Sequence, residues 1–411
     1  MKKRKPCIVV HTSDWHAGFK DFDSLYRSVL DPVDGFVQKV REIIEQCKEE
    51  DIEFGGICLE GDLYHTKLSN NSKEQRFVIN VINLLINIVI VENNAKIILL
   101  RGTIGHEFNQ IDNFKSFELN YPGKFEVFNT VGTTTIGDNY SVLVIPEEYM
   151  PESEQEAFYA PFFKDKKYDM TVMHAFFDFN CFSRNSVEKH FDGMPIFKHK
   201  EMLEMSRLTI AGHDHRHQII DGRLAYNGSL ISMTYSEDGE KGFIYTYMDD
   251  DEEEIYFVEN VLSPTFKTTD LKQIVKGKDY SFKNVVKYID KEFEKWDNLR
   301  INIGGDIMAE NPELILLLRE RYFRESKLRF EGQSVLLKDG RTIDQSDMEG
   351  ITIREENSDT ISSVGSGEFE FILDDRKSIT EKIIEFIKIK HPGNKSIPTS
   401  EKTNEIISDK K

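Results

Sequence analysis

Cysteine and long apolar stretches are scarce in this sequence of 411 residues. The four cysteines, Cys7, Cys47, Cys58 and Cys181, are too few for a disulfide framework, and none belongs to a CxxC pair. A reducing, cytoplasmic compartment is therefore the expected location. The longest apolar stretch, 77–91, contains three asparagines and is too short to cross a bilayer, so we expect no membrane span.

Basic residues are fewer than acidic ones: the chain has 53 Lys and Arg and 72 Asp and Glu, which gives a net charge of −19. Nucleic-acid-binding proteins usually present a basic face, so this balance argues mildly against a polyanion partner. Six consecutive carboxylates at 249–254 account for part of the charge, and bound cations reverse the sign of a local cleft. The chain does have 29 Phe and 15 Tyr to bury, and its length predicts two or three domains.

The first 110 residues alternate between strand and helix patterns. Strands are expected at 7–12, 55–59 and 97–100, and the stretches 36–47 and 77–88 between them have apolar residues at helical spacing. Ser72 and Gln75 have the spacing of a capping box before the second helix. This βαβαβ order predicts a parallel sheet covered by helices. Further strands are expected at 125–128, 141–145, 170–173, 208–211, 243–248 and 255–258.

Side chains that bind metals cluster where five of these strands end. In chain order they are Asp14 and His16, then Asp62 and His65, then His106, then His174, and last His213 and His215. Ligands of open α/β sheets bind beyond the carboxyl ends of the strands. Because residues i and i+2 of an extended segment point the same way, Asp14 with His16, and His213 with His215, are expected to converge in pairs.

These segments hold six of the eleven histidines. Mixed carboxylate and imidazole ligands suit manganese, iron or zinc. A carboxylate that bridges two such ions makes a clamp for in-line attack on phosphorus. Each motif alone is weak evidence, but the five together, in this order and all at strand ends, predict a metal centre.

The motifs are Asp-x-His at 14–16, Gly-Asp-Leu-Tyr-His at 61–65, a glycine-to-His-Glu segment at 102–107, the lone His174, and Gly-His-x-His at 212–215. This series resembles the calcineurin-like metallophosphoesterases. The form at 61–65 resembles the SbcD-type branch, the DNA repair and recombination nucleases related to meiotic-recombination-eleven. Segments 227–230 and 240–243 also resemble that branch, and the resemblance covers roughly residues 7–260.

The resemblance implies a fold and a domain order. The fold is α/β, a metallophosphoesterase core of two β-sheets flanked by helices in a four-layer α-β-β-α sandwich. The nuclease domain would span 1–265, a small α+β cap that binds DNA would span 266–341, and a helical or disordered tail that binds a partner would span 342–411. In that tail, Ser378 and Glu381 have capping-box spacing, which predicts an amphipathic helix at 378–390.

The resemblance also implies roles for the site residues, carried over motif by motif. Two manganese ions (or magnesium) would be held, the first by Asp14, His16 and His215, and the second by His174 and His213, with Asp62 as the bridge between them. His65 would face the scissile phosphate and His106 would transfer a proton near the leaving group. Branch members cut DNA in bacterial or phage-infected cells, pair with an SbcC-like, SMC-type ATPase, and usually form homodimers.

The third motif departs from the family pattern, which is Gly-Asn-His. This chain has Gly102-Thr103-Ile104-Gly105-His106-Glu107, so the asparagine that would bind the second ion is missing. Either Thr103 takes its place, or Gly105 aligns with it and Glu107 or Asn109 supplies an oxygen. Two alternative functions therefore stay open beside the DNA nuclease. One is a phosphodiesterase for small nucleotides, and the other is a catalytically weak binding subunit.

Overall fold

A computed structural model describes residues 3–19, 22–179 and 193–303, with gaps at 236, 238, 277–279 and 296–297, and scattered residues up to 343. The chain divides into two compact units, Met1–Thr342 and Ile343–Lys411. The predicted helix at 378–390 and Cys181 lie outside the described residues. The division into domains at 265 and 341 stays a prediction.

The first sheet has six strands in the order β14-β13-β1-β2-β3-β4. Its central strands β1 (Cys7–Thr12), β2 (Glu53–Glu60), β3 (Lys96–Leu100) and β4 (Phe125–Phe128) pair in parallel. The hairpin of β13 (Gly242–Met248) and β14 (Glu253–Glu259) joins antiparallel to β1 and places the acidic run at its turn. The predicted parallel βαβαβ arrangement is therefore present, with an antiparallel edge.

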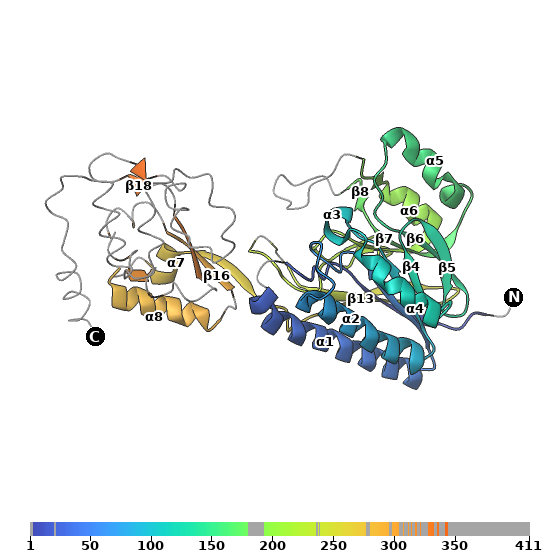
Figure 1. Ribbon diagram of the computed structural model, residues 1–411, viewed down its shortest axis with the longest axis horizontal. Coiled ribbons are helices and arrows are strands. Elements are labelled where there is room, and N and C mark those ends of the chain that lie inside the picture. The colour runs from blue at the N-terminus through green and yellow to red at the C-terminus, as the bar shows by residue number, and fades with distance from the viewer. Residues whose placement is uncertain are drawn as a thin grey trace. The chain divides into compact units, whose positions relative to one another are not determined.

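Two long helices cover one face of this sheet, α1 (Phe22–Glu49) and α2 (Lys73–Leu85), which continues as the π-helix η1 (Ile86–Val91) (Figure 1). The Ser72 side chain accepts a hydrogen bond from the backbone N–H of Gln75 at 3.0 Å and caps α2, as the sequence predicts. By length and composition alone, the 19-residue helix Lys73–Val91 is apolar enough to cross a membrane. Of its most apolar stretch, 56% is buried in the fold, which is typical of a core helix.

The second sheet also has six strands, in the order β11-β12-β10-β7-β6-β5. The strands β6 (Tyr140–Ile145), β7 (Tyr168–His174), β10 (Ser206–Gly212) and β12 (Leu224–Tyr226) pair in parallel, and β5 (Gly132–Ile136) and β11 (Gln218–Ile220) are antiparallel edges. Strands β5, β11 and β12 and helices α5 (Glu152–Phe163) and α6 (His199–Met205) were not expected from the sequence. The protein is thus mixed α/β, with two six-stranded sheets flanked by helices.

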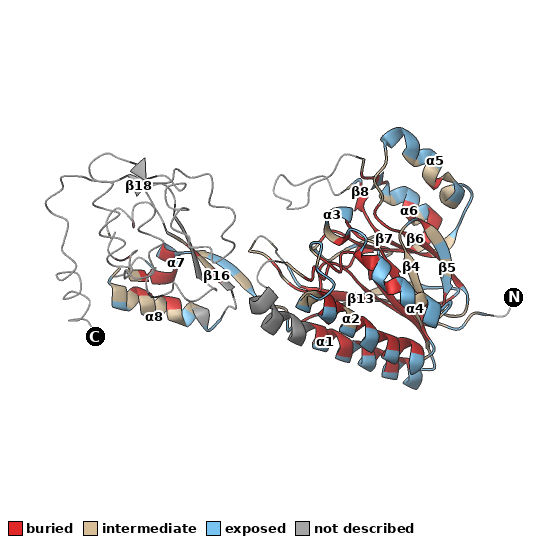
Figure 2. Ribbon diagram, in the orientation of Figure 1, coloured by how far each residue is buried: buried red, intermediate tan, exposed pale blue. Residues whose placement is uncertain are grey.

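Among the described residues, three large apolar clusters and one small one, of Ile210, Ala225 and Ile244, hold these layers together. One packs α1 and α2 on the first sheet, a second joins apolar side chains of β1, β2 and β3 to those of β6 and β7, and a third packs α5 and α6 on the second sheet. Figure 2 shows the buried residues on the strands and on the sides of α1 and α2 that face the first sheet. Cys7, Cys47 and Cys58 are buried and free, in agreement with a chain that needs no disulfide there.

The remaining elements are short. Helices α3 (Ile104–Glu107), η2 (Gln110–Phe114) and α4 (Lys115–Asn120) follow β3, and β8 (Phe176–Phe177) pairs with β9 (Ile196–Phe197). A separate parallel sheet contains β15 (Phe266–Asp270), β16 (Asn298–Ile303) and β17 (Leu328–Gly332), with α7 (Leu271–Val275) and α8 (Phe282–Phe293) between its first two strands. Strands β18 (Val335–Leu336) and β19 (Thr342–Ile343) form a pair.

Candidate metal centre

The site residues lie at strand ends, but the local backbone is not extended as the sequence argument assumed. Asp14, His16, Asp62 and His213 all have positive φ, between 47° and 95°. Asp and His tolerate this left-handed region better than bulky residues do, and such strained positions concentrate at functional sites. The expectation of convergence through i, i+2 alternation is therefore wrong: Asp14 and His16 do meet, but through left-handed backbone, and His213 and His215 belong to different ligand groups. Tight left-handed turns bring the side chains together.

The first ligand group contains Asp14, His16 and His215, whose ligand atoms all lie within 4.8 Å of one another. The two Nε2 atoms of His16 and His215 are 2.9 Å apart, and Asp14 Oδ1 is 3.9 Å and 3.8 Å from them. Asp14 is fully buried, and among the described residues no hydrogen-bond donor reaches its Oδ1. A buried carboxylate oxygen without a donor fits a position that a cation satisfies.

The second group contains Asp62, His174 and His213, all buried. His174 Nε2 lies 3.1 Å from His213 Nδ1 and 3.5 Å from Asp62 Oδ2. The other ring nitrogen of His174, Nδ1, lies 2.6 Å from the backbone carbonyl of Glu60, which only accepts, so Nδ1 carries the proton. In the neutral ring, Nε2 therefore presents a lone pair to the group, as a metal ligand does.

Asp62 connects this group with the other histidines. Its Oδ2 is 3.8 Å from His16 Nε2 in the first group and 2.9 Å from His106 Nδ1. His65 Nδ1 lies 3.3 Å from His16 Nδ1, and His16, His65 and His106 form a third cluster of possible ligands. The structure thus brings together all eight residues of the main motifs, with Asp62 between the two ligand groups.

The altered third motif has a clear geometry. Thr103 Oγ1 lies 3.5 Å from His174 Nε2 and 3.4 Å from His213 Nδ1, whereas the Cα of Gly105 faces open space. Glu107 is buried and accepts from the backbone N–H groups of Leu63 and Gly102 at 2.6 and 2.7 Å. Of the residues of this motif that could supply an oxygen, Thr103 is therefore the one beside the second group, while Glu107 holds the loop and Asn109 is exposed.

Two glutamates at the site were not predicted. Glu147 follows β6, is 2% exposed, and places Oε2 3.2 Å from His213 Nδ1. Glu237 places Oε1 3.3 Å from His215 Nδ1 and forms an ion pair with the buried Lys241 at 3.0 Å. The sequence holds one signal for the first of them, because Pro146-Glu147-Glu148 directly follows a predicted buried strand. Glu237 lies in a polar loop and has no such signal.

The electrostatics of the site favour positive charge. Burial disfavours the ionised form of Asp62, but His174 and His106 hold the pKa of Asp62 well below its ordinary value. Burial also opposes the charged form of His174, yet the nearby Asp62 raises the pKa of His174 well above its ordinary value. Burial lowers the pKa of His16, which favours the neutral imidazole that binds metals. Anionic surroundings of this kind favour a divalent cation.

These groups are therefore positioned to bind a metal ion. Carboxylate oxygens and imidazole nitrogens with lone pairs converge on two neighbouring points, and outer partners orient the rings. A further combination, His11, Cys58 and Glu60, is wholly buried, and His11 is already paired with Glu60 at 2.7 Å and Thr246 at 3.1 Å. These two hydrogen bonds join β1 to β2 and to β13 in the protein interior, so the cluster has a structural role.

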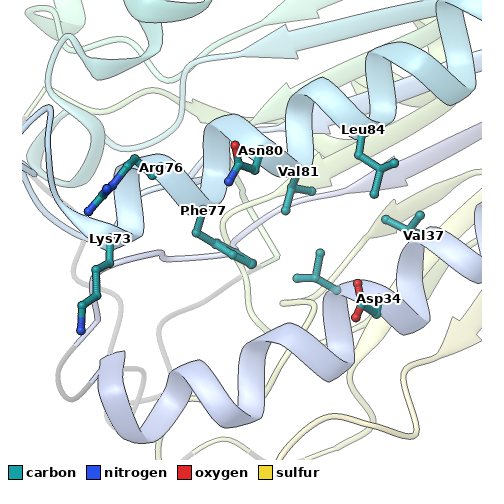
Figure 3. A pocket seen from close by; sticks show the side chains of 9 residues that line it. Asp34, Val37, Lys73, Arg76, Phe77, Asn80, Val81 and Leu84 are labelled. Atoms are coloured by element: carbon teal, nitrogen blue, oxygen red, sulfur yellow. The ribbon is translucent and has the colours of Figure 1, made fainter.

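A groove of about 410 Å³ lies elsewhere, between α1 and α2 (Figure 3). Val37, Phe77, Val81 and Leu84 form its apolar sides, and Lys73 and Arg76 lie at one end. None of the predicted site residues is among the described residues that line it. The size of this groove therefore carries no information about the metal centre.

In comparisons with known proteins, no protein-family model and no curated protein matches the chain. Function is therefore inferred from the site and from its motifs.

Proposed function

We propose that this chain is a metal-dependent phosphodiesterase that cuts DNA. The observation that carries the proposal is the position of Asp62 between two groups of ligands, with His106 beside it and His65 beside His16. Two ions held a few ångströms apart by a shared carboxylate suit in-line displacement at phosphorus. The two sheets with helices on their outer faces support the proposal that the core is a metallophosphoesterase sandwich.

The residues take the following roles in the proposal. Asp14, His16 and His215 hold one ion, His174 and His213 hold the other, and Asp62 is shared. Manganese, or magnesium, would supply Lewis acidity when held by these residues. His106, held by Asp62 and partly exposed, delivers a proton to the leaving oxygen, and His65 orients the phosphate. Trp15 and Tyr64 are buried in the core, so they support the site as packing residues.

The partners follow from the resemblance to the SbcD-type branch and remain part of the proposal. DNA ends would be bound with the help of the region at 266–341. An SbcC-like ATPase would bind the tail at 342–411, and two copies of the chain would form a homodimer in the cytoplasm. Because the net charge of −19 repels phosphate, the metal ions and local basic residues would have to bind the DNA backbone.

The same charge favours one second candidate, a phosphodiesterase that acts on small nucleotides, because a small substrate needs no extended basic surface. One assay separates the candidates. The purified chain is incubated with linear duplex DNA, or with bis(p-nitrophenyl) phosphate, in manganese or in chelator. Manganese-dependent release of nucleotides from DNA supports the nuclease. Hydrolysis of the small ester alone supports the second candidate, and hydrolysis of neither ends both.

A further inference from the structure

Glu147 is a buried carboxylate that lies beside the second ligand group. Its Oε2 atom lies 3.2 Å from His213 Nδ1, 3.8 Å from His174 Nε2 and 3.3 Å from Thr103 Oγ1. The residue is 2% exposed. A charged carboxylate at this depth is costly unless cations or several hydrogen bonds offset the loss of water.

The backbone holds Glu147 in this place. Strand β6 ends at Ile145, beside β7, which ends at His174, and β10 follows with Gly212 opposite His174. The three ligand positions thus stand at adjacent strand ends of the second sheet. The backbone N–H of Glu147 donates to the Arg101 carbonyl at 3.2 Å, and the Arg101 guanidinium donates to the Glu147 carbonyl at 2.9 Å. Tyr149 donates its hydroxyl to Oε1, which leaves Oε2 toward the histidines.

Oε2 has three polar neighbours, the Thr103 hydroxyl and the rings of His213 and His174. In neutral His174 the Nε2 lone pair faces the carboxylate, because Nδ1 donates to the Glu60 carbonyl. A lone pair and a carboxylate oxygen repel each other unless a positive charge lies between them. Thr103 contributes a neutral hydroxyl that donates to Oε2 and so orients it. A hard carboxylate oxygen beside two imidazoles and Asp62 completes a four-ligand set for manganese.

We propose that Glu147 is a protein ligand of the second metal ion and replaces the asparagine of the Gly-Asn-His motif, with Thr103 as the residue that positions it. The inference rests on the proposed metal-dependent function. It gives the second site two carboxylates, Asp62 and Glu147, where the family pattern has one carboxylate and a neutral amide. The oxygen ligand that an asparagine in the loop after β3 supplies in the family pattern would then come from Glu147 at the end of β6.

The test is manganese binding to the full chain, with bound and free Mn²⁺ measured by electron paramagnetic resonance. Glu147→Gln keeps the shape of the side chain and removes its charge. The matched control is Glu148→Gln, since the neighbouring glutamate pairs with Arg101 at 3.3 Å and is not part of either ligand group. Circular dichroism checks that each variant is folded.

Wild type and Glu148→Gln should bind two ions. Glu147→Gln should bind one ion with unchanged affinity and the second at least about tenfold more weakly, the least that lost ligand support usually costs. Tight binding of both ions by Glu147→Gln would overturn the assignment. If that variant does not fold, wild-type crystals soaked in manganese decide, because the second anomalous peak must then touch Glu147 Oε2. A wild type that binds two ions and cuts no phosphodiester ends the proposed function and leaves this assignment intact.

Discussion

Asp62 is the residue on which both ligand groups depend. Its Oδ1 accepts from the backbone N–H of Thr103 at 2.6 Å, and its Oδ2 faces the histidines of both groups. A shared carboxylate offsets the mutual repulsion of two cations, so its loss weakens both sites.

Asp62→Asn should therefore lose most bound manganese while the chain stays folded. The measurement is metal content after gel filtration, with Asp112→Asn as the control because Asp112 is a surface carboxylate paired with Lys115. Full retention of both ions and of activity would remove the bridging assignment.

His106 should matter for turnover more than for metal affinity. Its ring is held by Asp62 at 2.9 Å and its side chain is 34% exposed, which suits a group that exchanges a proton with substrate. His106→Ala should bind manganese and DNA normally and cut DNA about 100- to 10,000-fold more slowly. Single-turnover cleavage is compared with His199→Ala, whose ring pairs with Asp178 away from the site. A variant that loses its metal instead would make His106 a ligand.

At this scale the sequence predicts histidines better than glutamates. Histidine is rare, so six of eleven at strand ends form a visible pattern. Acidic residues number 72, and neither Glu147 nor Glu237 belongs to a spaced motif. Their roles depend on which strands are adjacent in the second sheet, and that order is set by tertiary pairing rather than by local sequence.

At the scale of elements, the long periodic segments were predictable and the short ones were not. Strands β1, β2 and β3 and helix α2 have strong apolar periodicity and a cap, and they appear within a few residues of the expected bounds. Strands β5, β11 and β12 are short edge or near-edge elements with weak alternation. Helix α5 carries Pro161 and aromatic residues on several sides, so its sequence lacks a helical stripe.

One tie between elements has a pH dependence that can be measured. The Arg4 guanidinium forms two hydrogen bonds with the carboxylate of Asp169 on β7, at 2.8 and 2.9 Å, and a third with Asp250 in the acidic hairpin. Burial opposes ionisation of Asp169, but Arg4 and Ser141 lower its pKa below the ordinary value. A carboxylate with a depressed pKa stabilises the fold above its unfolded pKa, and that contribution disappears as the pH falls through its folded pKa.

Arg4→Ala should lower the free energy of unfolding at pH 7 by about 1.5–3 kcal/mol, the range for hydrogen bonds to charged groups. The difference from wild type should shrink below about pH 3.9, the ordinary Asp value, as Asp169 becomes protonated. Urea unfolding at several pH values measures it, and Lys39→Ala, which breaks an exposed pair with Glu42, is the control. An equal loss at pH 3 and pH 7 would show that the charge of Asp169 is not involved.

At the scale of the whole molecule, the α/β class and the position of the site at strand ends followed from the sequence. The left-handed turns that aim Asp14, His16, Asp62 and His213 did not, because φ at a single residue is set by the contacts of the surrounding loop. The amphipathic segment at 378–390 is a sequence prediction that lies outside the described residues.

Deletion of 378–411 tests the proposed partner segment. The truncated chain should fold, bind manganese and keep basal manganese-dependent cleavage, because every proposed ligand, Glu147 included, lies before residue 216. It should lose binding to an SbcC-like ATPase in a co-purification assay, since an amphipathic helix presents one apolar face to a partner. Unfolding would show that the segment packs on its own chain, and unchanged association would end its role in partner binding.

The proposed chemistry depends on two metal ions that share Asp62. Anomalous scattering from crystals soaked in manganese tests it most directly. We expect two peaks, one among Asp14, His16 and His215 and one among His174, His213 and Glu147, both in contact with Asp62. A single peak, or peaks away from these residues, would contradict it.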